Sequence, residues 1–160
     1  NAQPVEKLNH IRLLSDNRIL EIDGVNIGDT AFYTCTATNE AGQLERNFNL
    51  EVLVPPTISR DSIQTNLAAI HNQTVKLYCP ATGIPEPSIM WMKEQVPYLD
   101  FPYPRHRLLD DSQTLEISSV NLNDVGNYSC RAMNPAGQDD LDYTLQIFVP
   151  PAISKPSSDK

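Results

Sequence analysis

The sequence contains three cysteines, whose thiols could bind a metal, attack a substrate or form a disulfide. Cys35, Cys79 and Cys130 are separated by 44 and 51 positions, with no Cys-x-x-Cys pair and no nearby histidine pair. This spacing disfavours a metal site. The odd number of cysteines leaves open a free thiol beside a disulfide.

The other reactive side chains also match no motif. His10, His71 and His106 have no Cys, Ser or carboxylate partner at motif spacing, and we expect them to be solvated surface residues. The acidic residues at 110–111 and 139–142 lack EF-hand spacing and are interpreted as a turn and the start of a hairpin strand. There is no Gly-rich phosphate loop and no nucleophile elbow. The sequence therefore predicts no catalysis, cofactor, metal site or small-molecule substrate.

The composition excludes further classes of protein. The chain has 160 residues and a formal net charge of −8, and its 12 basic residues are scattered, which argues against nucleic-acid binding. Hydrophobic residues make up 40% of the chain, enough for a packed core. No apolar run approaches the roughly 18–20 residues of a membrane span, so we expect no membrane insertion in this stretch.

An internal repeat organises the chain. Residues 12–59 and 107–154 share 23 identities in 48 positions at an offset of 130 − 35 = 95. Cys79 and Trp91 in the second copy have counterparts that would fall before residue 1, so the first unit is expected to be a C-terminal half. A Val-Pro-Pro run opens the second unit and recurs at 149–151. We therefore expect the chain to cut through an array at both ends.

Alternation of apolar and polar residues indicates the elements that carry these side chains. Short segments with period two, separated by turn signals, are typical of half-buried strands in an all-β sandwich. Residues 122–125 are expected to form a single helical turn. The expected domains are half a sandwich over 1–54, a complete sandwich over 55–149 and the start of another over 150–160.

The spacing in the second unit resembles the immunoglobulin fold. Trp91 follows Cys79 by twelve residues, and Asp-x-Gly-x-Tyr-x-Cys occupies 124–130. The run Cys-x-Ala-x-Asn-x-Ala-Gly, present at 35–42 and 130–137, is similar to the intermediate or I-set class. The resemblance covers almost the whole chain and implies tandem I-set β-sandwiches.

This resemblance implies a role for each signature residue. Cys79 and Cys130 would bridge the two facing sheets, and Trp91 would pack against that bridge. Tyr128 would be the tyrosine corner, with its hydroxyl bonded to upstream backbone, and Tyr33 is its counterpart in the first unit. Within this scheme Cys35 is unpaired, because its partner would precede residue 1.

A finer resemblance concerns the junctions. Val-Pro-Pro-x-Ile at 54–58 and 149–153, and Gly-Ile-Pro-Glu-Pro at 83–87, are similar to the tandem arrays of hemicentin-type matrix proteins. Two prolines favour an extended, semi-rigid connection between units. The family implies an extracellular matrix or cell-surface location and partners that are other proteins, bound homophilically or heterophilically, including matrix components.

Two Asn-x-Ser/Thr sequons favour the same location. Asn72 lies in the turn before the strand of Cys79, and Asn127 lies at the start of the strand of Cys130, pointing away from the core. Both are candidates for N-glycosylation. A disulfide between Cys79 and Cys130 would also persist in an oxidising compartment.

One segment offers a candidate binding patch. Tyr98, Phe101 and Tyr103 lie in a proline-rich stretch and would form an exposed aromatic anchor for a partner. The alternative is that these rings cover the edge of a sheet and that proline blocks edge pairing.

The leading hypothesis is a non-catalytic extracellular adhesion or matrix module that forms a semi-rigid rod. The alternatives are an intracellular sarcomeric I-set array, and the ectodomain of a cell-surface receptor whose activity lies outside these 160 residues.

Overall fold

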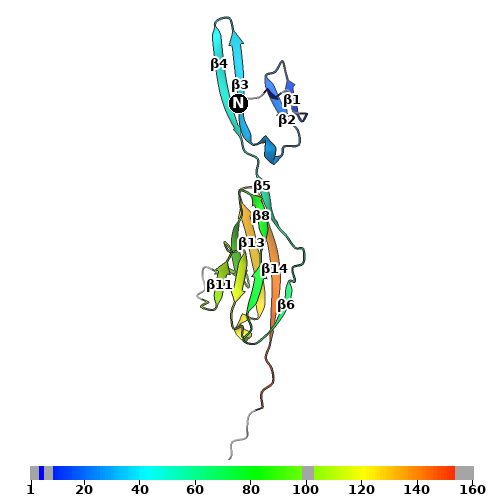
Figure 1. The fold of residues 1–160 in the computed structure, drawn as a ribbon, viewed down its shortest axis with the longest axis vertical. Helices are drawn as coiled ribbons and strands as arrows, with labels where there is room; N and C mark the ends of the chain where they lie inside the picture. The colour runs from blue at the N-terminus through cyan, green and yellow to red at the C-terminus, as the bar shows by residue number, and fades with distance from the viewer. Residues whose placement is uncertain (1–3, 6–8, 99–102, 154–160) are drawn as a thin grey trace, which may run out of the picture. The chain divides into compact units, whose positions relative to one another are not determined.

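A computed structural model describes residues 4–5, 9–98 and 103–153 and confirms the expected all-β fold (Figure 1). The chain divides into two compact units, residues 1–53 and residues 54–160, which we call unit 1 and unit 2.

Unit 1 consists of two antiparallel hairpins joined by a single turn of 3₁₀ helix. The first hairpin pairs β1 (Ile11–Leu14) with β2 (Ile19–Ile22), and the second pairs β3 (Ala31–Asn39) with β4 (Gly42–Leu50). The 3₁₀ turn η2 (Ile27–Asp29) connects them. In Figure 1, β3 and β4 run side by side as a long ribbon.

The larger sheet of unit 2 has five strands. Their order is β10 (Val96–Pro97), β9 (Ser88–Lys93), β13 (Gly126–Asn134), β14 (Gly137–Phe148) and β6 (Asn66–Ile70). Every neighbouring pair is antiparallel except β14 and β6, which run parallel.

The second layer of unit 2 is built from shorter strands. A three-stranded sheet has the order β11 (His106–Leu109), β12 (Thr114–Ile117) and β7 (Val75–Tyr78). A two-stranded sheet pairs β5 (Val54–Ile58) with β8 (Ala81–Ile84).

The two prolines after Val54 lie inside β5 rather than in a free connection. The register of β5 against β8 shifts between Val54 and Thr57, so Pro55 and Pro56 occupy an irregular part of the ladder. Proline lacks a backbone N–H and is therefore tolerated at an edge strand or a bulge. The residues between β4 and β5 are Glu51–Leu53.

The 95-residue repeat is preserved in the register of the strands. Ile11 pairs with Ile22 in unit 1, as His106 pairs with Ile117 in unit 2. The turn η4 (Leu122–Asp124) repeats η2 and confirms the expected single turn. Each turn has a capping box, in which an Asn caps the first turn and an Asp accepts from the Asn backbone N–H.

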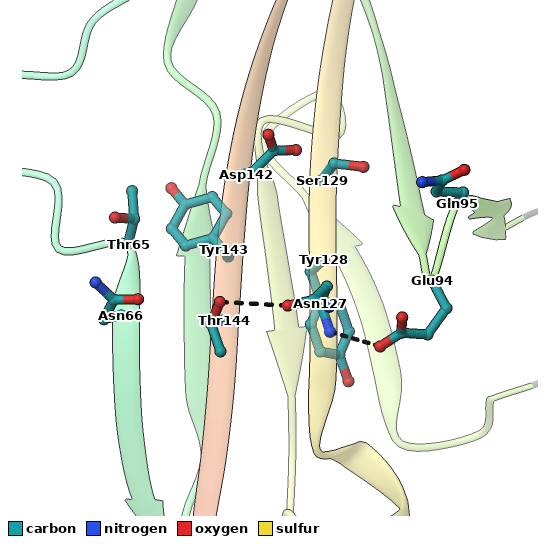
Figure 2. Close-up of a pocket in the computed structure, with 10 residues that line it drawn as sticks. All are labelled: Thr65, Asn66, Glu94, Gln95, Asn127, Tyr128, Ser129, Asp142, Tyr143 and Thr144. Atoms are coloured by element: carbon teal, nitrogen blue, oxygen red, sulfur yellow. Dashed lines mark hydrogen bonds between the residues drawn. The ribbon is translucent and has the colours of Figure 1, made fainter.

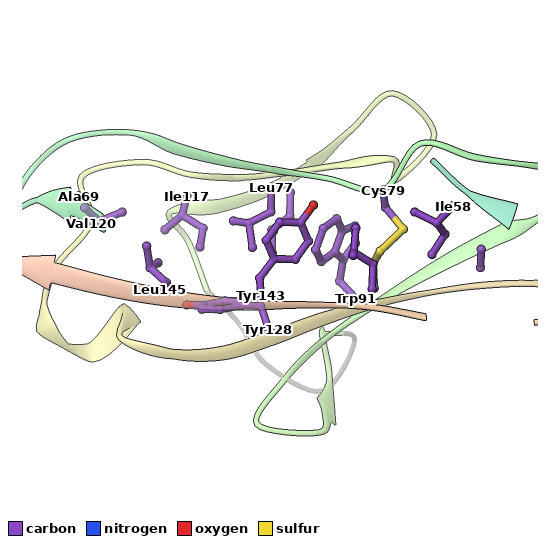
Figure 3. Packing of buried hydrophobic residues seen from close by; sticks show 14 of the residues in the cluster. Ile58, Ala69, Leu77, Cys79, Trp91, Ile117, Val120, Tyr128, Tyr143 and Leu145 are labelled. Carbon is purple, nitrogen blue, oxygen red and sulfur yellow. A yellow bond between two sulfur atoms is a disulfide. The ribbon is translucent and has the colours of Figure 1, made fainter. Parts of the chain in front are cut away.

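The core of unit 2 lies between its two layers (Figure 3). It is centred on Trp91, whose ring centroid is 6.1 Å from that of Tyr143. The Trp91 indole N–H donates to the carbonyl of Ser112 over 2.7 Å, which satisfies its one polar group. The remaining fully buried hydrophobic side chains come from both layers and include Ile58, Leu77, Leu115, Ile117, Val120 and Leu145.

Candidate functional site

The structure joins Cys79 and Cys130 by a disulfide that links the two layers of unit 2. Both residues are fully buried, and the Trp91 ring lies beside the sulfur atoms (Figure 3). Cys35 is exposed and has no disulfide partner among the described residues. The bridge thus belongs to the core and offers no accessible thiol.

The tyrosine hydroxyl expected to bond backbone does so in both units. The Tyr128 hydroxyl donates to the carbonyl of Asp124 over 2.6 Å, and the Tyr33 hydroxyl donates to the carbonyl of Asp29 over 2.9 Å. Burial is the main reason that the pKa of Tyr128 is raised far above its ordinary value. Each tyrosine therefore ties its long strand to the preceding 3₁₀ turn and has a structural role.

His106 corrects one sequence-based expectation, because it is not a solvated surface residue. Its side chain is only 1% exposed, although two arginines flank it. In the β11 register it opposes the buried Ile117, so alternation along the strand turns its side chain toward the core, whereas Arg107 points outward. The Tyr98 hydroxyl bonds its Nδ1, and its Nε2 lies 3.1 Å from Asp124 Oδ1. This pattern fits a neutral imidazole that accepts at Nδ1 and donates at Nε2.

The surroundings of His106 act on its protonation. Burial lowers the pKa of His106, and the hydrogen bond with Asp124 opposes that shift only in part. Burial alone would raise the pKa of Asp124, but hydrogen bonds from Arg105, the Asn121 backbone and His106 together lower it. Arg105 contacts both carboxylate oxygens of Asp124, at 2.8 and 3.0 Å.

His10 is partly exposed and has a carboxylate partner 19 positions away, a separation that no motif covers. Its Nε2 lies 2.6 Å from Asp29 Oδ1, and its side chain is 34% exposed. Position 10 aligns with position 105 in the repeat, so His10 holds its turn as Arg105 holds the turn of unit 2. Comparing the two copies at the 95-residue offset could have found this pairing. His71 lies in a turn and is half-buried.

The predicted aromatic patch is placed differently from an exposed anchor. Tyr98 packs against the core cluster, and its ring stacks on His106 at 5.5 Å. Tyr103 stacks on the same imidazole at 4.6 Å, and the Lys93 ammonium lies 5.8 Å from the Tyr103 centroid. Phe101 lies outside the described residues. The two described rings therefore pack on His106, and Tyr98 also packs on the core of unit 2.

The acidic residues near 140 form ion pairs. The Asp139 carboxylate accepts from the Ile58 backbone N–H at 2.7 Å and from Arg60, whose Nη2 lies 2.8 Å away. The hydrogen bond from Arg60 is the main reason that the pKa of Asp139 falls to about 2. Asp140 pairs with Arg131 at 2.7 Å. Within the described ranges, no group of three His, Cys, Asp or Glu side chains could hold a metal ion.

A polar groove of about 380 Å³ lies on the outward face of the larger sheet (Figure 2). Asn127 and Ser129 of β13 contribute to it, with Asp142 and Thr144 of β14 beside them. The turn after β9 closes one side through Glu94, whose Oε1 accepts from the Asn127 backbone N–H at 2.7 Å. The other candidate sequon residue, Asn72, is exposed in the turn between β6 and β7.

Two facing sheets, a disulfide between them, a tryptophan beside it and a tyrosine corner define an immunoglobulin-like β-sandwich. The family model described as the immunoglobulin I-set domain matches residues 1–52 and 56–147. The chain belongs to the immunoglobulin I-set family, in accord with the resemblance seen in its sequence.

Similar proteins include human hemicentin-1, which is 38% identical over 146 residues, covering 91% of this chain and 3% of that protein. Rat neural cell adhesion molecule 1 is 33% identical over 146 residues, covering 89% of this chain and 17% of that protein. The solved structure of extracellular domains 3–5 of Drosophila OTK has a TM-score of 0.72 and 31% identity, and it covers 88% of this chain and 47% of that one.

The chain thus spans only a small part of the curated relatives that it matches. Its family and its adhesion-molecule relative support a protein-interaction module. In the part of the chain that the structure describes, no helix is long and apolar enough to cross a membrane.

Proposed function

We propose that this chain is a non-catalytic extracellular module of an adhesion or matrix protein, and that it acts by binding other proteins. The observation that carries the proposal is the match of nearly the whole chain to I-set domains and to a cell adhesion molecule. The location is supported by the similarity to extracellular domains 3–5 of Drosophila OTK.

Two features of unit 2 support the extracellular location. The Cys79–Cys130 disulfide lies in the core, and such bonds persist in oxidising compartments and are rare in the cytosol. Asn72 and Asn127 both stand in sequons and are both exposed. A sarcomeric array would need neither feature.

The junction supports a semi-rigid spacing of units. Only Glu51–Leu53 separate β4 from β5, and β5 carries two prolines at its start. Proline restricts the backbone, so a short proline-bounded connection bends less than a Gly-rich linker. In a rod of such units, weak contacts repeated along the array add through effective concentration.

The location is tested by peptide mapping of protein from its native source, alkylated under denaturing conditions without reductant. We expect Cys79 and Cys130 to appear as one disulfide-linked peptide pair and the Asn72 peptide to carry glycan. Alkylated Cys79 and Cys130 with an unmodified Asn72 peptide would instead identify a reduced intracellular array.

The binding role is tested with beads coated with the oxidised chain. Aggregation of these beads with one another shows homophilic contact, and adhesion to surfaces of extracellular matrix shows heterophilic contact. Beads coated with reduced, alkylated chain are the control, because they keep the composition but lose the disulfide. Failure of the oxidised beads to adhere to either surface contradicts the adhesion role.

A further inference from the structure

The N-glycosylation sequon at residues 127–129 lies on β13, with its Asn and Ser on the outward face of the strand. Asn127 and Ser129 are two residues apart on one strand, so both side chains point away from the core, whereas Tyr128 between them is buried. Asn127 is exposed. The sequon can therefore carry a bulky group without disturbing the packing of unit 2.

The orientation of the Asn127 side chain is set by its neighbour. Its amide oxygen Oδ1 accepts a hydrogen bond from the Thr144 hydroxyl over 3.3 Å, as Figure 2 shows. The amide nitrogen Nδ2 therefore points away from Thr144, and it has no hydrogen-bond partner among the residues that the structure describes. Since Nδ2 is the atom that bonds a sugar, the attachment point faces solvent at the border of the polar groove.

The groove beside Asn127 has the chemistry of a sugar-binding surface. Hydroxyl, amide and carboxylate groups line it from three strands, namely Asn66, Ser129, Asp142 and Thr144. Sugars offer alternating donors and acceptors, which such groups can satisfy directly or through water. The groove has a volume of about 380 Å³.

We propose that Asn127 carries an N-linked glycan whose first sugars lie in this groove on the β13–β14–β6 face. Asn127 Nδ2 forms a bond to the anomeric carbon of a lipid-diphosphate oligosaccharide, the carbon–oxygen bond to the diphosphate breaks, and the amide loses one proton. The lipid diphosphate leaves, and no group is oxidised or reduced. The inference rests on the proposed extracellular location, because this donor is met in the secretory pathway.

Such a glycan distinguishes the two units. Position 127 aligns with position 32, where unit 1 has a phenylalanine that is 77% exposed and stands in no sequon. The glycan would cover this face in unit 2 and leave the same face bare in unit 1. Protein contacts of unit 2 would then use its other layer, where the exposed Lys76 and Arg107 both lie beside the half-buried Glu116 carboxylate.

The test is to express the 160-residue chain through a secretory pathway with a cleavable signal, and to map glycan occupancy by peptide mass after enzymatic deglycosylation. We expect glycan at Asn127, its loss in Ser129→Ala, and its retention in Ser129→Thr, which keeps the sequon. Asn72→Gln is the matched control and should leave the Asn127 glycan unchanged.

Whether the first sugars of the Asn127 glycan lie in the groove is measured by NMR on the same glycoprotein. We expect through-space contacts between the acetyl methyl group of the first N-acetylglucosamine and protons of Thr144 and Asn66. An unoccupied Asn127 beside an occupied Asn72 overturns the proposal, as does an occupied Asn127 without these contacts. The added signal sends the chain through the secretory pathway whatever its natural location. These outcomes therefore test the glycan proposal alone, whereas peptide mapping of native-source protein tests the location.

Discussion

The residue at the start of β11 differs between the repeats in a way that changes its chemistry. Ile11 fills this position in unit 1, and His106 fills it in unit 2 at the same register. The imidazole is hydrogen-bonded on both nitrogens, and Arg105 and Lys93 lie near enough to disfavour its protonation. Unit 2 has thus gained a buried titratable group where unit 1 needs only apolar volume.

This difference predicts a pH dependence of stability. Because burial lowers the pKa of His106 in the folded state, the unfolded state binds more protons below about pH 6.5. Stability is therefore full above that pH and falls on acidification, by at most about 1.4 kcal/mol per pH unit. Urea unfolding of the chain between pH 7.5 and 5 should show this slope, and His106→Ile should flatten it. An equal slope in both proteins would show that other groups carry the dependence.

The tyrosine corner gives a second residue-scale prediction. Tyr128→Phe removes one buried hydrogen bond to the Asp124 carbonyl, and we expect unit 2 to lose about 1–1.5 kcal/mol of unfolding free energy. Tyr143→Phe serves as a comparison, because it removes a different hydrogen bond, from the Tyr143 hydroxyl to the Tyr78 carbonyl. A change below a few tenths of a kcal/mol in Tyr128→Phe, measured by chemical denaturation, would contradict a structural role for the hydroxyl.

At the residue scale, the sequence correctly predicted the roles of residues that belong to a spaced signature. Cys79, Trp91, Tyr128 and Cys130 lie where the immunoglobulin resemblance placed them. The burial of His106 was missed because the histidines were judged only by partners at motif spacing, whereas its place opposite Ile117 in the β11–β12 register turns it inward. Packing of the Tyr98 and Tyr103 rings on that imidazole could not be predicted, since it depends on contacts between separate strands.

At the scale of elements, the first strand of unit 2, β5, is held by its ladder with β8, by burial of Ile58 and by one carboxylate of β14. At the end of β5 the Ile58 backbone N–H donates to the Asp139 carboxylate on β14, and Arg60 donates two more hydrogen bonds to the same side chain. Position 139 aligns with Leu44 in unit 1, so the repeat pattern gave no sign of this contact. The prolines in β5 were expected to form a connection, and only the ladder with β8 shows them to be part of a strand.

Neutralising this carboxylate should loosen β5 locally. Asp139→Asn keeps the shape but loses the charge-assisted bonds, and we expect exchange of the Ile58 amide proton to accelerate by roughly ten- to a hundredfold. Asp140→Asn is the matched control, because Asp140 pairs with Arg131 of the neighbouring strand. Acid should act in the same way: the stabilisation is present above the ordinary aspartate pKa and is lost as pH falls toward about 2. Equal exchange in both variants would contradict the assignment.

At the scale of the whole molecule, the two units differ in how much apolar surface they bury. The described hydrophobic core cluster lies entirely in unit 2. In unit 1, Phe32 and Leu44 are 77% and 76% exposed, and Phe48 is 52% exposed. Cys79 and Trp91, which lie in the core of unit 2, have no counterparts among residues 1–53.

Limited proteolysis of the chain should reveal the asymmetry. We expect cleavage within residues 1–53 at protease concentrations that leave residues 57–147 intact, because local opening is easier where few apolar contacts close the fold. Mass spectrometry of the resistant fragment identifies the boundary. Equal resistance of the two segments would show that unit 1 folds as stably as unit 2 in this chain.

Reducing the disulfide should act on unit 2 alone. The bond closes a loop of 51 residues, for which the chain-entropy model gives a stabilisation of about 4 kcal/mol. Thermal unfolding with and without reductant should show a lower midpoint for unit 2 in the reduced protein. Because Cys35 has no disulfide partner in the described structure, a reductant effect on unit 1 signals would contradict this assignment.

The identical registers of β1–β2 and β11–β12 have a consequence for assembly. Arg-Leu-Leu and Leu-Glu-Ile recur in both hairpins, so residues 11–14 can also pair with residues 114–117 of the neighbouring repeat. Pairing of β1 with β2 closes a loop over residues 15–18, whereas pairing of β1 with β12 would close a loop over residues 15–113. The shorter loop loses less conformational entropy and favours the native pairing by roughly 3 kcal/mol. Strand exchange between repeats is a known failure of tandem proteins. Faithful folding of such an array therefore depends on its shortest turns, and each doubling of the turn after β1 would reduce the preference for the native partner by about 0.6 kcal/mol.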